Sequence, residues 1–199
     1  MADTYVTAGD VQTMLADTDW TAAYTELLDL LGERASRLID RATGREAGAY
    51  QAAVTPAARL FDGTGGVEQW VDEMAAAPTL VEVDEGGLYT YTTWAAGDYT
   101  VWPYNETPYR RLDILRTGDH ARWPSYSRSV RVTARWGYSI TPPADIAQAA
   151  TIQTVRYFKR AQQAFQDTGA IIDLGQLRYV KELDPDVALI VAHYRRLAI

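Results

Sequence analysis

The stretch RWGYSITPPADIAQAATIQTVRYFKR, from Arg135 to Arg160, joins two kinds of structure. The residues before it, SVRVTA at 129–134, alternate apolar and polar side chains as a strand does. After its two prolines, apolar residues recur at steps of three and four, which predicts a helix. Pro142 and Pro143 can neither extend a strand ladder nor lie inside a helix, but Pro143 suits a first helical turn. The stretch therefore predicts a switch from sheet to helix.

Helical spacing also marks both ends of the chain. Residues 19–44 predict a long helix that starts at an Asp19 N-cap and ends at Gly44. A shorter helix is expected over 9–15, and DPDVALIVAHYRRL at 184–197 predicts a last one. The predicted apolar faces comprise Tyr24, Leu27, Leu28, Leu31, Ala35, Leu38 and Ala42 on the first long helix, Ile146, Ala149, Ile152, Val155, Phe158 and Phe165 on the second, and Val187, Ile190, Tyr194 and Leu197 on the last.

The middle of the chain has a different period. From Ala58 to Tyr138, short segments rich in Val, Thr, Tyr and Trp are separated by Gly, Pro, Asn and Asp, which indicates antiparallel strands. Gly86-Gly87 predicts a hairpin, and the glycines of DGTGG (62–66) predict a tight hairpin turn. The predicted fold is α+β: a helical bundle with an inserted antiparallel β module and an extended C-terminal arm that ends in a short helix. The expected boundaries are 1–57 for the first helices, 58–140 for the β module, 141–167 for the helix completing the bundle, and 168–199 for the linker and last helix.

Composition limits the classes of function. The 199 residues are 47% hydrophobic, which is enough for a core, and the absence of cysteine excludes disulfides and thiolate chemistry. No apolar run approaches the roughly 18 residues of a membrane span. The first residues lack the basic and apolar regions of a secretory signal. These features fit a protein made in a reducing cytoplasm, and we expect no membrane partner.

The charge is negative and unevenly distributed. A formal net charge of −7 argues against bulk binding of duplex DNA, which needs clustered cations. Residues 1–100 hold 5 basic and 17 acidic side chains, whereas residues 101–199 hold 14 and 9. Such a split suits copies that pack head to flank, and it equally suits two solvated faces of different bias.

Motifs for catalysis, cofactors or metals are weak. DGTGG lacks the lysine and the following helix of a phosphate-binding loop. His120 and His193 lie far apart, without metal-ligand spacing and without a nucleophile motif beside them. Acidic pairs such as Asp84-Glu85 lie near predicted turns, where a solvated role is favoured. We predict no enzyme activity, no cofactor and no metal.

Aromatic residues leave an alternative function open. Many of the six Trp and thirteen Tyr lie between 89 and 138, where they could stack on sugars. Their alternation favours a role in the core and in cross-strand pairs. The alternative hypothesis is a carbohydrate- or peptide-binding module on a helical stalk, and a carboxylate-dependent hydrolase is a third, less favoured one.

Several stretches, in order, resemble the head–tail connector (adaptor) proteins of tailed bacteriophages, prophages and gene transfer agents. The most specific is the strand ending in W-G-Y, its short link to P-x-D-I, and the alanine-rich helix ending in basic residues. The resemblance extends from about Val11 to Arg196. The stretches that carry it are LLDLLGERASRLIDRATGR (27–45), RLFDGTGG (59–66), PTLVEV (78–83), GDYTVWPYN (97–105), PYRRLDI (108–114), VRVTARWGYSITPPADIAQAATIQTVRYFKR (130–160) and LGQLRYVKELDPDVALIVAHYRR (174–196).

The resemblance implies a structural virion protein at the head–tail junction. Members form a ring of about twelve subunits beneath the portal, extend the DNA channel and present a docking surface to the next neck or tail-completion protein. The implied partners are the portal, other copies of the chain and that downstream protein, with DNA passing through but not specifically bound. The last helix and its linker are then the expected interface with the portal or a neighbouring subunit, through Leu174, Leu177, Tyr194, Arg195 and Arg196.

Overall fold

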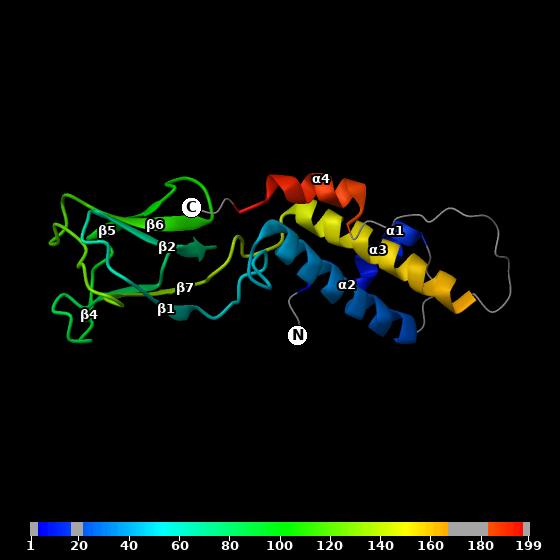
Figure 1. The fold of residues 1–199 in the computed structure, drawn as a ribbon, viewed down its shortest axis with the longest axis horizontal. Helices are drawn as coiled ribbons and strands as arrows, with labels where there is room; N and C mark the ends of the chain where they lie inside the picture. Colours follow the sequence, from blue (N-terminus) through cyan, green and yellow to red (C-terminus); the bar gives the residue numbers. More distant parts are fainter. Residues whose placement is uncertain (1–3, 17–21, 167–182, 197–199) are drawn as a thin grey trace. The chain divides into compact units, whose positions relative to one another are not determined.

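The computed structural model describes residues 4–16, 22–166 and 183–196, which divide into two compact units. The helical unit combines Met1–Gly48 with Pro142–Ile199, and the sheet unit is Ala49–Thr141. The α+β class, with four helices, antiparallel sheets and a short C-terminal helix among the described residues, is confirmed. Figure 1 shows that segments far apart in the sequence, α2 (blue) and α3 (yellow to orange), lie side by side in the helical unit.

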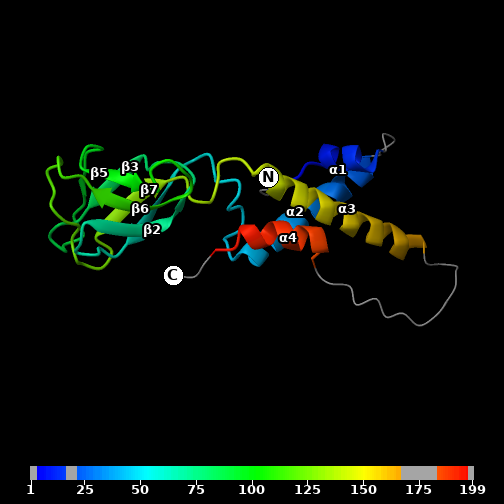
Figure 2. The same ribbon diagram turned by 90° about the horizontal axis from the view of Figure 1, so that it is seen from above.

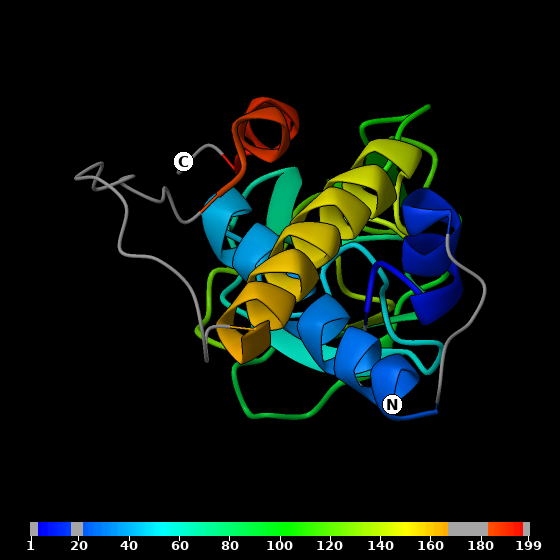
Figure 3. The ribbon, with the colours of Figure 1, turned by 90° about the vertical axis from the view of Figure 1, so that its right-hand side faces the viewer.

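The helical unit is built on two long helices. The short helices α1 and α4 contact this pair, and Figure 3 shows them on opposite sides of it. Thr7 caps α1 in a capping box, in which Thr7 and Asp10 satisfy each other's backbone N–H groups. The helices are α1 (Ala8–Leu15), α2 (Ala22–Thr43), α3 (Ala144–Gln166) and α4 (Pro185–His193).

Only some residues of the predicted apolar faces are buried in the core of the helical unit. Leu28 and Leu38 of α2 and Phe158 of α3 are buried, whereas Leu31 and Ile152 are only half-buried. Tyr24 is exposed but packs the edge of its ring on Phe158, at 6.1 Å between centroids. The predicted Asp19 cap lies outside the described residues. Among the described residues, the buried apolar residues of the helical unit are Tyr5, Val6, Val11, Leu28, Ala35, Leu38, Ile39, Ile146, Ala149, Ala150, Phe158, Val187 and Val191.

The sheet unit contains two antiparallel sheets. One has the order β1-β7-β3-β4 and the other β2-β6-β5. Valines on β3 and β7 and Leu112 on β6 face one another in a single core, in which the rings of Trp94 and Trp123 stack at 4.6 Å. The strands are β1 (Ala57–Phe61), β2 (Glu68–Met74), β3 (Leu80–Val83), β4 (Thr92–Thr93), β5 (Tyr99–Trp102), β6 (Tyr109–Ile114) and β7 (Val130–Ala134).

The predicted switch from sheet to helix follows β7. Gly137 has a φ of 140°, and a Cβ there would lie 2.6 Å from the Ala49 carbonyl oxygen, so only glycine fits. α3 begins at Ala144, and the Pro143 carbonyl accepts the first helical hydrogen bond, from the Ala147 N–H at 2.9 Å. Pro143 is thus the residue before the helix, where its missing N–H costs no helical hydrogen bond.

The DGTGG segment is not the hairpin turn that its glycines predict. β1 pairs with β7 and β2 pairs with β6, so residues 62–67 cross from one sheet to the other. The buried Gln69 side chain holds this crossing, accepting from the Thr64 N–H at 3.1 Å and donating to the Asp62 carbonyl at 3.0 Å. Glycine content indicates a tight bend but carries no information on which strands pair. The Gly86-Gly87 hairpin, between β3 and β4, is confirmed.

Candidate interaction surfaces

The C-terminal helix packs on its own subunit. Asp184 caps α4 by accepting from the Asp186 N–H at 3.1 Å, and it also forms a 2.8 Å ion pair with Arg156 of α3. Val187 and Val191 are buried where α4 contacts α2 and α3, and Figure 2 shows α4 (red) beside these two helices. The expectation that this helix reaches outward is therefore corrected for residues 183–196.

The end of α4 is tied to the end of α2. The Arg196 N–H donates to the Thr43 carbonyl at 2.9 Å, and the Arg45 guanidinium donates to the Tyr194 carbonyl. The Tyr194 hydroxyl lies 3.4 Å from a carboxylate oxygen of Asp145 on α3. Of the residues predicted for an interface, Tyr194, Arg195 and Arg196 therefore meet here, whereas Leu174 and Leu177 lie outside the described residues.

These contacts bring four arginines together, Arg41, Arg45, Arg195 and Arg196, which we name the arginine cluster. Arg41, Arg195 and Arg196 are exposed, and within residues 4–16, 22–166 and 183–196 none of these three forms an ion pair. Sequence analysis missed Arg41 and Arg45, because their proximity to Arg195 depends on the packing of α4 against α2. Cations at helix C-termini also complement the helix dipole.

The first half of α2 has the opposite charge. Glu26, Asp29 and Glu33 recur at steps of three and four, so they share one face, which we name the acidic stripe. Leu30 lies among them with 66% of its surface exposed. None of the three carboxylates forms an ion pair with a described residue.

The charge split between the halves of the sequence does not separate the two units. The helical unit contains 11 basic and 15 acidic residues, and the sheet unit contains 8 and 11. Because the helical unit draws on both ends of the chain, it combines the acidic first half with the basic second half. The resulting asymmetry lies within the helical unit, between the acidic stripe and the arginine cluster.

The outer face of the β2-β6-β5 sheet carries an aromatic row. Trp70, Arg111 and Trp102 are direct cross-strand neighbours, and the guanidinium lies 5.2 and 4.6 Å from the two indole centroids. Arg111 also pairs with Glu68 at 3.0 Å and with Asp113 at 2.7 Å. Trp70 is 44% exposed. Indole and guanidinium groups of this kind are enriched at protein–protein interfaces.

Sequence reasoning assigned the aromatic residues to the core, and this holds for only part of them. Trp94 and Trp123 are buried, as expected. On β2, polar Gln69 is buried and Trp70 faces outward. The side chains of a strand alternate in direction, and Val71 packs toward the core. The alternation alone therefore indicates that its neighbour Trp70 faces outward.

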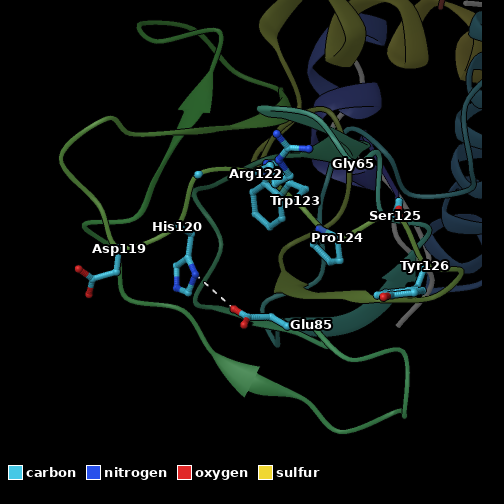
Figure 4. Close-up of a pocket in the computed structure, with 10 residues that line it drawn as sticks. Gly65, Glu85, Asp119, His120, Arg122, Trp123, Pro124, Ser125 and Tyr126 are labelled. Atoms are coloured by element: carbon cyan, nitrogen blue, oxygen red, sulfur yellow. Dashed lines mark ion pairs between the residues drawn. The ribbon is translucent and has the colours of Figure 1, made fainter.

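A cavity of about 520 Å³ lies beside the loop before β7 (Figure 4). His120 lines it and stacks flat on Trp94, at 3.9 Å between ring centroids. Its Nδ1 lies 3.2 Å from Glu85, and its Nε2 lies 3.8 Å from Asp98. A hydrogen bond from the Asp119 N–H is the main cause that lowers the pKa of Asp98. These contacts join the loop before β7 to residues that border β3, β4 and β5.

Metal ligation and membrane insertion have no structural counterpart in the described part of the chain. No group of three or more His, Asp or Glu side chains converges there as metal ligands would. None of the helices in residues 4–16, 22–166 and 183–196 is both long and apolar enough to cross a bilayer.

Comparison with known proteins supports the fold. No protein-family model and no curated protein matches the chain. Among solved structures, a chain from "Neck of empty GTA particle computed with C6 symmetry" is similar with a TM-score of 0.56 and 17% identity, over 96% of this chain and 90% of that one. A chain from "Neck of native GTA particle computed with C12 symmetry" has a TM-score of 0.49 and 14% identity, over 96% and 92%. The first likeness confirms the fold expected from the sequence resemblance to connectors of gene transfer agents.

Proposed function

We propose that this chain is a structural neck protein of a phage-like particle, a head–tail connector. The observation that carries the proposal is the shared fold, which extends over 96% of the chain and includes both units. The ordered sequence resemblance to head–tail connectors supports the same assignment from independent stretches. In this role the protein acts through its surfaces and catalyses no reaction.

In its finer form, the proposal is a ring of about twelve copies beneath the portal. The ring extends the DNA channel and offers a surface to the next neck or tail-completion protein, which places the chain in the virion at the head–tail junction. A net charge of −7 suits a conduit, because a basic lumen would retain the duplex that must pass through it. Tyr194, Arg195 and Arg196 belong to a surface exposed for such contacts.

A sugar-binding module is the weaker alternative. Trp70 and Trp102 would have to offer open ring faces to a sugar, but Arg111 lies over both indoles. Glu68 and Asp113 hold that guanidinium in place. The arrangement is better suited to the flat, rigid contact of a protein partner.

The proposal is tested by deleting the gene and then adding back the purified protein. In the phage, prophage or gene transfer agent that encodes it, deletion of the gene is expected to yield DNA-filled heads without tails. Addition of the purified protein to those heads, with tails supplied, should restore tailed particles. A matched addition of heat-denatured protein is the control. Tailed particles in the deletion strain, without addition, would contradict the proposal.

A further inference from the structure

Two surfaces of opposite charge lie at different ends of one helix. Asp29 belongs to the acidic stripe and Arg41 to the arginine cluster, twelve positions apart on α2. At 1.5 Å per residue, their backbones are about 18 Å apart along the helix axis. This separation is too large for an ion pair, so the two surfaces cannot neutralise each other within one subunit.

Several other arginines pair internally. Arg59 bonds Asp72 at 2.7 Å, and Arg131 bonds Glu82 at 2.7 Å. Arg156 bonds Asp184 at 2.8 Å within the helical unit itself. By contrast, the acidic stripe and Arg41, Arg195 and Arg196 form no ion pair with a described residue, a property that they share with other exposed arginines such as Arg116 and Arg128 of the sheet unit.

The acidic stripe includes one exposed apolar side chain. Leu30, exposed to 66%, has Glu26 four positions before it and Glu33 three positions after it on the same helix face. In a contact, Leu30 would supply an apolar centre and the carboxylates a polar rim. Hydrogen bonds from Arg45 and from the Arg196 N–H hold the arginine cluster in one arrangement, which reduces the entropy lost when it binds.

We propose that the arginine cluster of one copy docks on the acidic stripe of the next, with Leu30 covered at the centre of the contact. The occupant of each surface is a second copy of this chain, because each surface carries the charge that the other lacks. The two surfaces differ, so the contact is head-to-tail and closes into a ring when the rotation permits. The inference rests on the proposed function, for which it supplies the contact between adjacent ring subunits.

The absence of cysteine permits a direct test. Leu30→Cys marks the acidic stripe, and Ala192→Cys marks the exposed surface of α4 beside the arginine cluster; both variants keep every charge. The two variants are mixed at low ionic strength and oxidised mildly. The control mixture pairs Leu30→Cys with Leu88→Cys, which is 78% exposed in the sheet unit.

We expect at least a fivefold larger fraction of disulfide-linked mixed dimer from the Leu30→Cys and Ala192→Cys pair than from the control. The excess should disappear in 0.5 M salt, at which the screening length is about 4 Å. It should also disappear when Arg195→Glu and Arg196→Glu are added to the second variant. Adding Asp29→Arg and Glu33→Arg to the first should then restore it. Equal yields in both mixtures, or an excess that charge reversal does not reduce, would overturn the inference.

Assembly on heads distinguishes a failure of the docking inference from a failure of the proposed function. If the variant with Arg195→Glu and Arg196→Glu restores tailed particles as well as the wild type, the docking inference fails and the neck function stands. If the wild-type protein never joins heads while the crosslink keeps its charge dependence, the docking contact stands and the neck function fails. Circular dichroism of each variant verifies that the helices are intact.

Discussion

Three arginines of the sheet unit and two of the helical unit have contrasting surroundings. Arg59, Arg111 and Arg131 in the sheet unit each pair with a carboxylate and lie over an aromatic ring. In the helical unit, Arg41 and Arg195 are exposed and form no ion pair with a described residue. Arginines that are paired within a unit contribute to its stability, whereas exposed, unpaired charges of both signs provide surfaces for association. The comparison leads to the predictions below, given from the largest expected effect to the smallest.

Removal of residues 184–199 should destabilise the helical unit most. The truncation exposes the surfaces of α2 and α3 that Val187 and Val191 cover, and each fully buried valine contributes about 1.5–3 kcal/mol. We expect a loss of about 3–6 kcal/mol, measured by urea unfolding monitored by far-UV circular dichroism. Removal of 197–199 alone is the matched control. Unchanged unfolding of the longer truncation would mean that α4 does not belong to the helical core.

Phe158→Ala should destabilise the same unit by about 3–5 kcal/mol, because Phe158 is 2% exposed and its loss leaves a cavity. Leu30→Ala, on the exposed face of α2, should change stability by about 0.5 kcal/mol or less. Five of the six tryptophans belong to the sheet unit, so fluorescence in a Trp20→Phe background reports on that unit. If the two units are separately cooperative, Phe158→Ala shifts the dichroism transition and leaves the fluorescence transition in place.

Arg111→Ala should destabilise the sheet unit by about 1.5–3 kcal/mol, the usual contribution of hydrogen bonds to a charged group. The substitution leaves Glu68 and Asp113 facing each other without a cation. Arg195→Ala is the matched substitution in the helical unit and should change stability by about 0.5 kcal/mol or less. Urea unfolding followed by tryptophan fluorescence and dichroism measures both. Equal effects of the two substitutions would remove the distinction between internally paired and outward-facing arginines.

Acid should weaken the sheet unit, in which three carboxyl groups have a lowered pKa. Hydrogen bonds from Ser127 lower the pKa of Asp62, those from Arg131 lower the pKa of Glu82, and the Asp119 N–H lowers the pKa of Asp98. A carboxyl group whose pKa is lower in the folded state contributes stability that is present above the unfolded-state pKa of about 4 and is lost as pH falls through the folded value.

In the helical unit, a hydrogen bond from the Thr7 hydroxyl lowers the pKa of Asp10. We expect the fluorescence melting temperature, which reports on the sheet unit, to fall between about pH 5 and pH 2. Asp98→Asn should flatten part of that fall. A fluorescence melting temperature that stays constant over this range would contradict the assignment.

Much of the architecture could be predicted from the sequence because it depends on local pattern. The periods of α2 and α3, the Asp184 cap and the change from sheet to helix at Pro142-Pro143 are local signals. The pairing of β1 with β7 is not local, and for this reason DGTGG was taken for a hairpin turn. The burial of polar Gln69 next to outward-facing Trp70 depends on the loop that Gln69 binds.

The candidate surfaces could be predicted only in part. Tyr194, Arg195 and Arg196 were selected from the sequence, but Arg41 and Arg45 join them only because α4 packs along α2. The difference in charge between the two halves of the chain is visible in the sequence. Both charges occur in the helical unit because the two ends of the chain fold together there, which the sequence does not show. Folding thus converts a charge difference along the chain into two surfaces on one helix.

The most direct test of the neck assignment is a cryo-EM reconstruction of the head–tail junction. The sample is DNA-filled, tailless heads from the deletion strain, incubated with the purified chain and compared with untreated heads. We expect new ring-shaped density at the portal vertex of treated heads only, into which the helical and sheet units fit as separate bodies. Treated heads whose portal vertex is indistinguishable from that of untreated heads, at a protein concentration in large excess over heads, would contradict the assignment.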